Sequence, residues 1–179
     1  MLIPVGEPWA PARAGAGRFK GLSRKVAALL LSVVCTAAFA ESTLPTATDL
    51  QADAYTSRKV GIPILILYSL PGCPHCEAIR RGHLTPLAAE MPPKAIIRQI
   101  DLQSVTKLRG FDGKLVAHED FVRAQGIKFA PVVVFFDAAG NRLGDPLVGS
   151  MLPDFYGAYL ADGLAAATRA IRRSKAKPP

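Results

Sequence analysis

Two cysteines, Cys73 and Cys76, are separated by two residues in the stretch "YSLPGCPHCEAIR", residues 68–80. A pair of thiols at this spacing can hold a metal ion, form a structural disulfide or work as a redox couple. The apolar run "IPILILY" before them is typical of a strand buried on both faces, and Pro74 suits the first turn of a helix. The cysteines are therefore expected where a strand ends and a helix begins.

The other residues of the chain favour the redox couple. Zinc sites usually combine a C-x-x-C pair with a second pair of ligands, but His83 and His118 show no paired spacing. A passive disulfide would close only a four-residue loop, which adds little stability to a whole domain. Structural zinc and a passive disulfide remain the alternatives.

The first forty residues have the pattern of a targeting segment. A basic stretch, residues 17–25, precedes an apolar run of 15 residues, 26–40, which ends in the small-x-small sequence Ala38-Phe39-Ala40. This pattern predicts a signal peptide cleaved after Ala40 and export to the periplasm. The alternative is a retained membrane anchor, although 15 helical residues span only about 22 Å of a ~30 Å hydrocarbon core. Cys35 lies inside the run and is expected to leave with it.

Composition and charge indicate one globular domain after this segment. Half of the 179 residues are hydrophobic and 20% are charged, which excludes a disordered chain. The net charge of +8 is spread unevenly. After residues 1–40 are set aside, only the C-terminus carries a basic cluster, which is typical of a solvated helix end. No nucleic-acid partner is expected. The predicted organisation is a signal peptide (1–40), one domain (41–174) and a disordered tail (175–179).

Hydrophobic patterning predicts alternating helices and strands and hence an α/β fold. The expected order is helix, strand, helix, strand, helix, strand, strand, helix. Gly82 and Pro86 should interrupt the second helix, and residues 103–117 should form a small hairpin or excursion. The expected elements span residues 45–61, 62–69, 73–91, 95–102, 119–127, 131–136, a strand ending near 148, and 153–174. In the last helix the candidates for burial are Phe155, Tyr159, Leu160, Leu164 and Ile171.

Two segments together resemble the thioredoxin superfamily, over about residues 62–167. They are Cys-Pro-His-Cys after a buried strand and "QGIKFAPVVVFFDAAGNRLGDPLVG", residues 125–149. The resemblance implies a thioredoxin-like fold, with a central mixed β-sheet flanked by helices and a long C-terminal helix. It also implies that Pro131 is a cis-proline and that Ala130 and Pro131 contribute to substrate binding.

The same resemblance implies an exported thiol–disulfide oxidoreductase. Cys73 would be the nucleophile and Cys76 the resolving cysteine, and no cofactor beyond their disulfide would be needed. The expected partners are thiol- or disulfide-bearing proteins and a redox partner, soluble or membrane-bound, and the protein is expected to be a monomer. Whether it oxidises or reduces its partners stays open. The alternatives are a copper carrier that uses the two thiols and a binding protein whose thiols are incidental.

Two positions depart from the family pattern, and two motif residues invite a chemical role. Leu67 stands where the family carries a buried acid, six residues before the first cysteine, and Gly72 stands where a tryptophan is common. Pro74 fixes the backbone φ within the motif. His75, when protonated, should favour the Cys73 thiolate. Residues 111–120 could form a lip beside the site or be a tolerated surface insertion.

Overall fold

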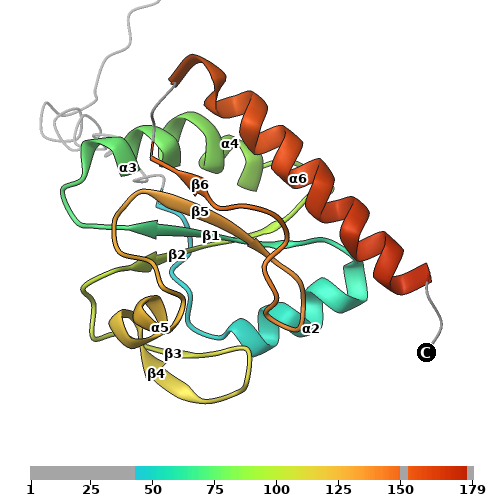
Figure 1. Ribbon diagram of the computed structural model, residues 1–179, viewed down its shortest axis with the longest axis horizontal. Coiled ribbons are helices and arrows are strands. Elements are labelled where there is room, and N and C mark those ends of the chain that lie inside the picture. The colour runs from blue at the N-terminus through green and yellow to red at the C-terminus, as the bar shows by residue number, and fades with distance from the viewer. Residues whose placement is uncertain (1–42, 150–152, 177–179) are drawn as a thin grey trace, which may run out of the picture. The chain divides into compact units, whose positions relative to one another are not determined.

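The computed structural model describes residues 43–149 and 153–176, which form a mixed β-sheet with helices on both faces (Figure 1). The four strands have the order β2-β1-β5-β6. Strands β1 and β2 are parallel, β5 is antiparallel to β1, and β6 is antiparallel to β5. The strands are β1 (Ile64–Ser69), β2 (Ile96–Asp101), β5 (Val132–Phe136) and β6 (Leu147–Val148).

Strand β1 is central, and its apolar run is explained by burial on both faces. All six of its residues are buried. Leu65 and Leu67 pack into the cluster on one face, whereas Ile64, Ile66 and Tyr68 pack into the cluster on the other. Because side chains alternate along a strand, a continuous apolar run supplies two cores at once.

The helices divide between these two faces (Figure 1). The first face is covered by the helix that follows β1 and by the long C-terminal helix. The second face is covered by a helix near the start of the domain, by a short helix before β5 and by a two-stranded hairpin. On the first face lie α3 (Pro74–Ile79), η1 (Arg80–Leu84), α4 (Thr85–Ala88) and α6 (Pro153–Ala176); on the second lie α2 (Leu50–Val60), β3 (Lys107–Arg109), β4 (Leu115–Ala117) and α5 (His118–Ala124).

This topology is a thioredoxin-like fold, and the fold class predicted from the sequence is confirmed. The predicted interruption of the second helix is also present. Between α3 and α4 the chain takes one π-helical turn, in which the Thr85 N–H donates to the Arg80 carbonyl five residues earlier. Pro86 has no N–H to donate, which explains why regular helical bonding is disturbed here.

The burial pattern of α6 corrects part of the prediction. Leu160, Leu164 and Ile171 are buried as expected, but Phe155 and Tyr159 are 59% and 53% exposed. The buried stripe instead continues through Tyr156 and Ala167, at steps of three and four residues from its neighbours. Phe155 and Tyr159 each lie one position off this stripe and therefore face away from the core. Their burial was predicted wrongly.

The start of the first helix and the end of the last helix also differ from the prediction. Helix α6 runs through Ala176, so Lys175 is helical and not part of a disordered tail. Residues 177–179 and the predicted signal peptide lie outside the described residues. At the other end, the helix begins at Leu50, not at residue 45, because Asp49 caps it by accepting the Ala52 N–H at 2.9 Å.

Residues 45–47 run beside β2 instead of forming the first turn of that helix. The Ala47 N–H donates to the Gln99 carbonyl, and the Gln99 N–H donates to the Pro45 carbonyl, each at 2.9 Å. The start of the domain therefore covers one edge of the sheet.

The excursion between β2 and α5 forms the predicted hairpin, β3–β4, and is anchored to the core. The Phe111 ring lies 5.4 Å from Phe136 and 6.4 Å from Phe121, measured between centroids. His118 is 1% exposed, and its Nε2 lies 2.9 Å from the Ala47 carbonyl oxygen. Phe111 and His118 therefore anchor segment 111–120 to the core, whereas Asp112, Lys114, Leu115 and Asp120 of the same segment are exposed.

Candidate redox site

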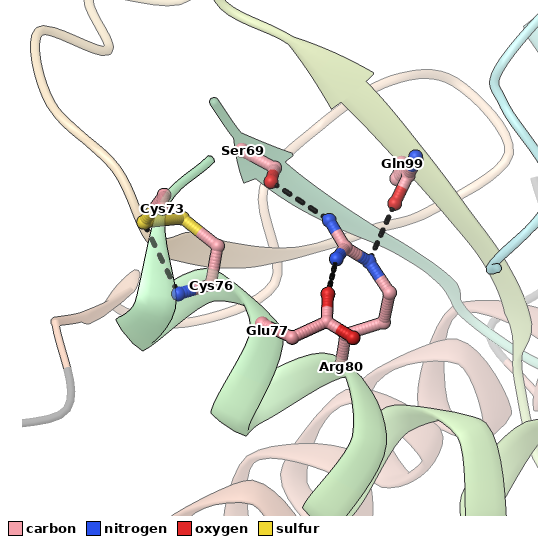
Figure 2. The surroundings of a disulfide bond; sticks show 6 residues. All are labelled: Ser69, Cys73, Cys76, Glu77, Arg80 and Gln99. Carbon is pink, nitrogen blue, oxygen red and sulfur yellow. Dashed lines mark hydrogen bonds and ion pairs between the residues drawn. A yellow bond between two sulfur atoms is a disulfide. The ribbon is translucent and has the colours of Figure 1, made fainter. Parts of the chain in front are cut away.

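Cys73 and Cys76 form a disulfide at the start of α3, with their Cα atoms 5.3 Å apart (Figure 2). Cys73 is the N-cap residue, and its Sγ accepts the Cys76 backbone N–H at 3.1 Å. Gly72 precedes it with φ 67°, in the left-handed region. Side chains with a Cβ are disfavoured there, which gives a backbone reason for glycine where a tryptophan was expected.

The two sulfurs differ in accessibility. Cys73 is partly exposed, whereas Cys76 is completely buried. A partner can therefore reach Cys73 but not Cys76. The unpaired N–H groups and the positive dipole end of a helix favour a negative sulfur at the N-cap. This geometry fits the nucleophile and resolving roles predicted for the two cysteines.

Pro74 and His75 occupy the first turn of α3, and both are exposed. Pro74 lies at the first helical position, where its missing N–H costs no helical bond. The effect of His75 on Cys73 stays a prediction.

The Ala130–Pro131 peptide bond is cis, as predicted. Pro131 directly precedes Val132, which pairs with Tyr68 near the end of β1. Because the chain from β1 reaches Cys73 after four more residues, Pro131 lies at the same end of the sheet as the disulfide. Pro131 is buried and its carbonyl accepts the Gly149 N–H at 2.8 Å, while Ala130 is half-exposed. Contact of these two residues with a substrate stays a prediction.

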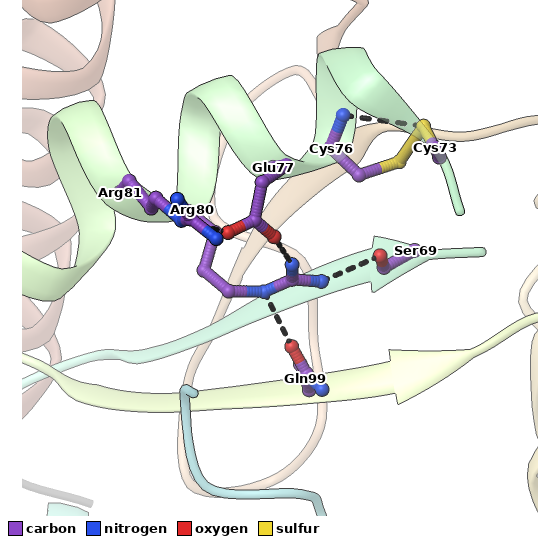
Figure 3. Close-up of polar contacts among 7 residues, drawn as sticks. All are labelled: Ser69, Cys73, Cys76, Glu77, Arg80, Arg81 and Gln99. Atoms are coloured by element: carbon purple, nitrogen blue, oxygen red, sulfur yellow. Dashed lines mark hydrogen bonds and ion pairs between the residues drawn. A yellow bond between two sulfur atoms is a disulfide. The ribbon is translucent and has the colours of Figure 1, made fainter. Parts of the chain in front are cut away.

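Leu67, one of the two departures from the family pattern, lies in an apolar position. Leu67 is fully buried and lies between Gln99 of β2 and Val133 of β5. However, a charged group lies beside it. The Arg80 guanidinium donates to Gln99 Oε1 at 2.9 Å and to Ser69 Oγ at 3.0 Å, and it pairs with Glu77 (Figure 3).

This network was not predicted from the sequence. A Glu followed three and four residues later by Arg on one helix is a recognisable signal, and Glu77 does pair with both Arg80 and Arg81. The contacts of Arg80 with Ser69 of β1 and Gln99 of β2 join residues 11 and 19 positions apart in the chain, and no local pattern predicts them.

A hollow of about 350 Å³ lies beside this end of the sheet, between the loop after β1 and α5. It is lined by both apolar and charged residues. Glu119 is the member of segment 111–120 that contributes to it. The lining residues are Leu70, Leu102, Gln103, Glu119, Val122, Arg123, Ile127 and Lys128.

His83 and His118 lie away from the cysteines. The His83 ring packs against Tyr156 with a centroid distance of 5.1 Å, and His118 is buried on the opposite face of the sheet. Within residues 43–149 and 153–176, no three His, Cys, Asp or Glu side chains are grouped as a metal site. No observation in this part of the chain favours the copper-carrier alternative.

No protein-family model matches the chain, and no curated protein matches it. Solved structures with a similar arrangement include a thioredoxin variant from Halobacterium salinarum, with 19% identity, 70% of this chain and 89% of that chain covered, and a TM-score of 0.47. Mitochondrial thioredoxin 3 from Saccharomyces cerevisiae has 17% identity, coverage of 68% and 93%, and a TM-score of 0.46. The C-terminal domain of DsbD from Neisseria meningitidis has 17% identity, coverage of 66% and 98%, and a TM-score of 0.46.

All three TM-scores are below 0.5. The fold is therefore assigned from the strand order and the strand register of this chain. Among the described residues, no helix has both the length and the apolar character that a membrane span requires. The site thus consists of an asymmetric disulfide at a helix N-cap, a cis-proline at the same end of the sheet and a charged network under the helix.

Proposed function

We propose that the protein is an exported thiol–disulfide oxidoreductase that exchanges disulfides with protein partners through Cys73 and Cys76. The observation that supports this most is the asymmetric disulfide, with one partly exposed sulfur at a helix N-cap and one buried sulfur a turn later. A disulfide that served only stability would not need an exposed member at the end of a helix where thiolates are favoured.

The reaction is a pair of thiolate–disulfide displacements. In the reducing direction, the Cys73 thiolate attacks a partner disulfide, forms a mixed disulfide and releases one partner sulfur as a thiolate. The Cys76 thiol then gives its proton to the partner thiolate just released and attacks Cys73 Sγ, which releases the second partner sulfur as a thiolate. Two electrons have passed from the cysteine pair to the partner, and the oxidising direction is the reverse.

Export to the periplasm belongs to this proposal. The apolar run 26–40 with its Ala-Phe-Ala end supports it, and an oxidising compartment is where such a disulfide persists. A redox partner, soluble or membrane-bound, would renew the active form of the cysteine pair. N-terminal sequencing of the processed protein should give Glu41 as the first residue, whereas retention of residues 17–25 would show an anchor.

The mixed disulfide provides the direct test. A Cys76→Ser variant should accumulate covalent complexes with partner proteins, because nothing remains to release the partner from Cys73. A Cys73→Ser variant is the matched control and should trap none, since its remaining thiol is buried. The complexes of the Cys76→Ser variant should disappear on reduction. Equal trapping by the two variants, or none by either, would contradict the proposed function.

A further inference from the structure

The charged network under α3 lies where the resolving cysteine and the sheet meet. Arg80 is four residues after Cys76, so their side chains leave the helix on the same face, about 5–6 Å apart at Cβ. The Arg80 N–H also donates to the Cys76 carbonyl. Figures 2 and 3 show its guanidinium between the helix and the strands, pointing to Ser69 and Gln99.

The guanidinium occupies the surroundings of the missing acid. Gln99 is the register partner of Leu67, and Ser69 follows two residues later on the same face of β1. Arg80 bonds to both Gln99 and Ser69, and its side chain is 14% exposed. The site therefore places a cation, bonded to Gln99 and Ser69, next to the position at which the resembled family carries a buried acid. At this burial its charge is screened less than a surface charge.

Glu77 supplies the opposite charge. It directly follows Cys76 and lies one turn after Cys73, and its carboxylate pairs with Arg80 and with the more exposed Arg81. A cation near the sulfurs stabilises a thiolate, and an anion near them destabilises it. Only the reduced form of the cysteine pair carries a thiolate, so each charge acts on the balance between the dithiol and the disulfide.

We propose that Arg80 and Glu77 are positioning residues that set the redox poise of the Cys73–Cys76 pair by opposing charges, in place of the carboxyl group that Leu67 removes. Arg80 favours the reduced form and Glu77 favours the disulfide. The proposal rests on the proposed function, since it concerns the same thiol–disulfide exchange. No co-reactant beyond the partner thiols and disulfides is required.

The test compares the thiol–disulfide equilibrium with glutathione in wild type, Arg80→Met, Glu77→Gln and the double variant, at one pH and one salt concentration. Arg80→Met should shift the equilibrium constant three- to tenfold towards the disulfide. Glu77→Gln should shift it three- to tenfold towards the dithiol. The double variant should lie within twofold of wild type, because both charges are absent.

These opposite signs separate a charge effect from a structural one. If the network only braced the helix, both single variants would shift the equilibrium in the same direction and the double variant would be furthest from wild type. That result would overturn the proposal, as would a Glu77→Gln variant with no shift. Arg80→Lys keeps the charge and should stay near wild type, and it keeps the test valid if Arg80→Met unfolds.

Two controls complete the experiment. Arg81→Ala removes an exposed arginine from the same carboxylate and should shift the equilibrium less than twofold. Wild type that fails to exchange with glutathione at all would refute the proposed function itself. Wild type that exchanges normally while the variants fail the sign test would refute only the role of the charge pair.

Discussion

His75 is the residue most directly testable within the motif. It lies in the first turn of α3, between the two cysteines, and is exposed. A protonated imidazole there adds to the positive helix end and stabilises the Cys73 thiolate. His75→Ala should therefore raise the Cys73 thiol pKa and make the reduction potential more negative by about 10–30 mV, where 30 mV corresponds to ~1.4 kcal/mol.

Glutathione equilibration and the rate of alkylation against pH measure both quantities. The matched control is His83→Ala. His83 lies on the π-helical turn after α3, outside the motif, and its ring packs against Tyr156. An unmoved potential in His75→Ala would contradict the electrostatic role of His75 and leave the fold assignment intact.

At the scale of elements, the packing of α6 on β5 depends on a glycine. A Cβ built on Gly163 would lie 2.8 Å from Cε2 of Phe135, which is 2% exposed and cannot move aside. Glycine within a helix is ordinarily about 0.5–1 kcal/mol less favourable than alanine. Here the contact should dominate, and Gly163→Ala should destabilise the domain by about 1–3 kcal/mol.

The same helix offers a control for that prediction. A Cβ on Gly157 would meet only the His83 ring, at 3.6 Å, which is an ordinary contact. Gly157→Ala should therefore be neutral or stabilising by up to about 1 kcal/mol. Urea unfolding of both variants measures the difference, and equal effects would show that α6 does not need this close approach.

An ion pair between a buried aspartate and a partly buried arginine joins α2 to β2. Arg98 donates two hydrogen bonds to the Asp53 carboxylate, at 2.6 and 2.9 Å, and the Asp53 side chain is 8% exposed. Asp53→Ala would leave a partly buried guanidinium without its partner and should cost about 3 kcal/mol of unfolding free energy. The exposed pair Arg123–Asp120 is the control, and Asp120→Ala should cost less than about 1 kcal/mol. If Asp53→Ala lost as little unfolding free energy as Asp120→Ala, the ion pair would not stabilise the packing of α2 on β2.

Features that depend on residues close together in the chain were predicted from the sequence, whereas contacts between residues far apart in the chain were not. The run in β1, the N-cap position of Cys73 and the interruption before Pro86 are local patterns, and the structure contains all three. The Asp53–Arg98 pair joins residues 45 positions apart in the chain, so no local pattern predicts it. The Arg80 contacts with the strands were hidden for the same reason.

At the scale of the whole molecule, two buried phenols should govern stability in alkali. Burial raises the pKa of both Tyr68 and Tyr156 above the ordinary value of 10.0. Below pH 10 the folded and unfolded states are equally protonated at these groups. Above it the unfolded chain loses protons that the folded chain keeps, so stability should fall with pH, by about 1.4 kcal/mol per pH unit for each tyrosine.

Single Tyr→Phe variants test this through unfolding free energy measured between pH 9 and 11. Tyr68→Phe and Tyr156→Phe should each reduce the slope, whereas Tyr55→Phe and Tyr159→Phe alter exposed rings and should not. Neither buried hydroxyl has a hydrogen-bond partner, so the first two variants should lose little or no stability at neutral pH. Identical slopes in all four variants would contradict the assignment.

The short pairing at both margins of the sheet has a consequence for self-association. One margin is occupied by residues 45–47 beside β2, and the other by β6, a strand of two residues with Gly144 and Pro146 just before it. Neither margin offers the long row of unpaired backbone groups that templates the addition of strands from other chains. The short pairing at these two margins should therefore disfavour the growth of the sheet by strand addition from other chains.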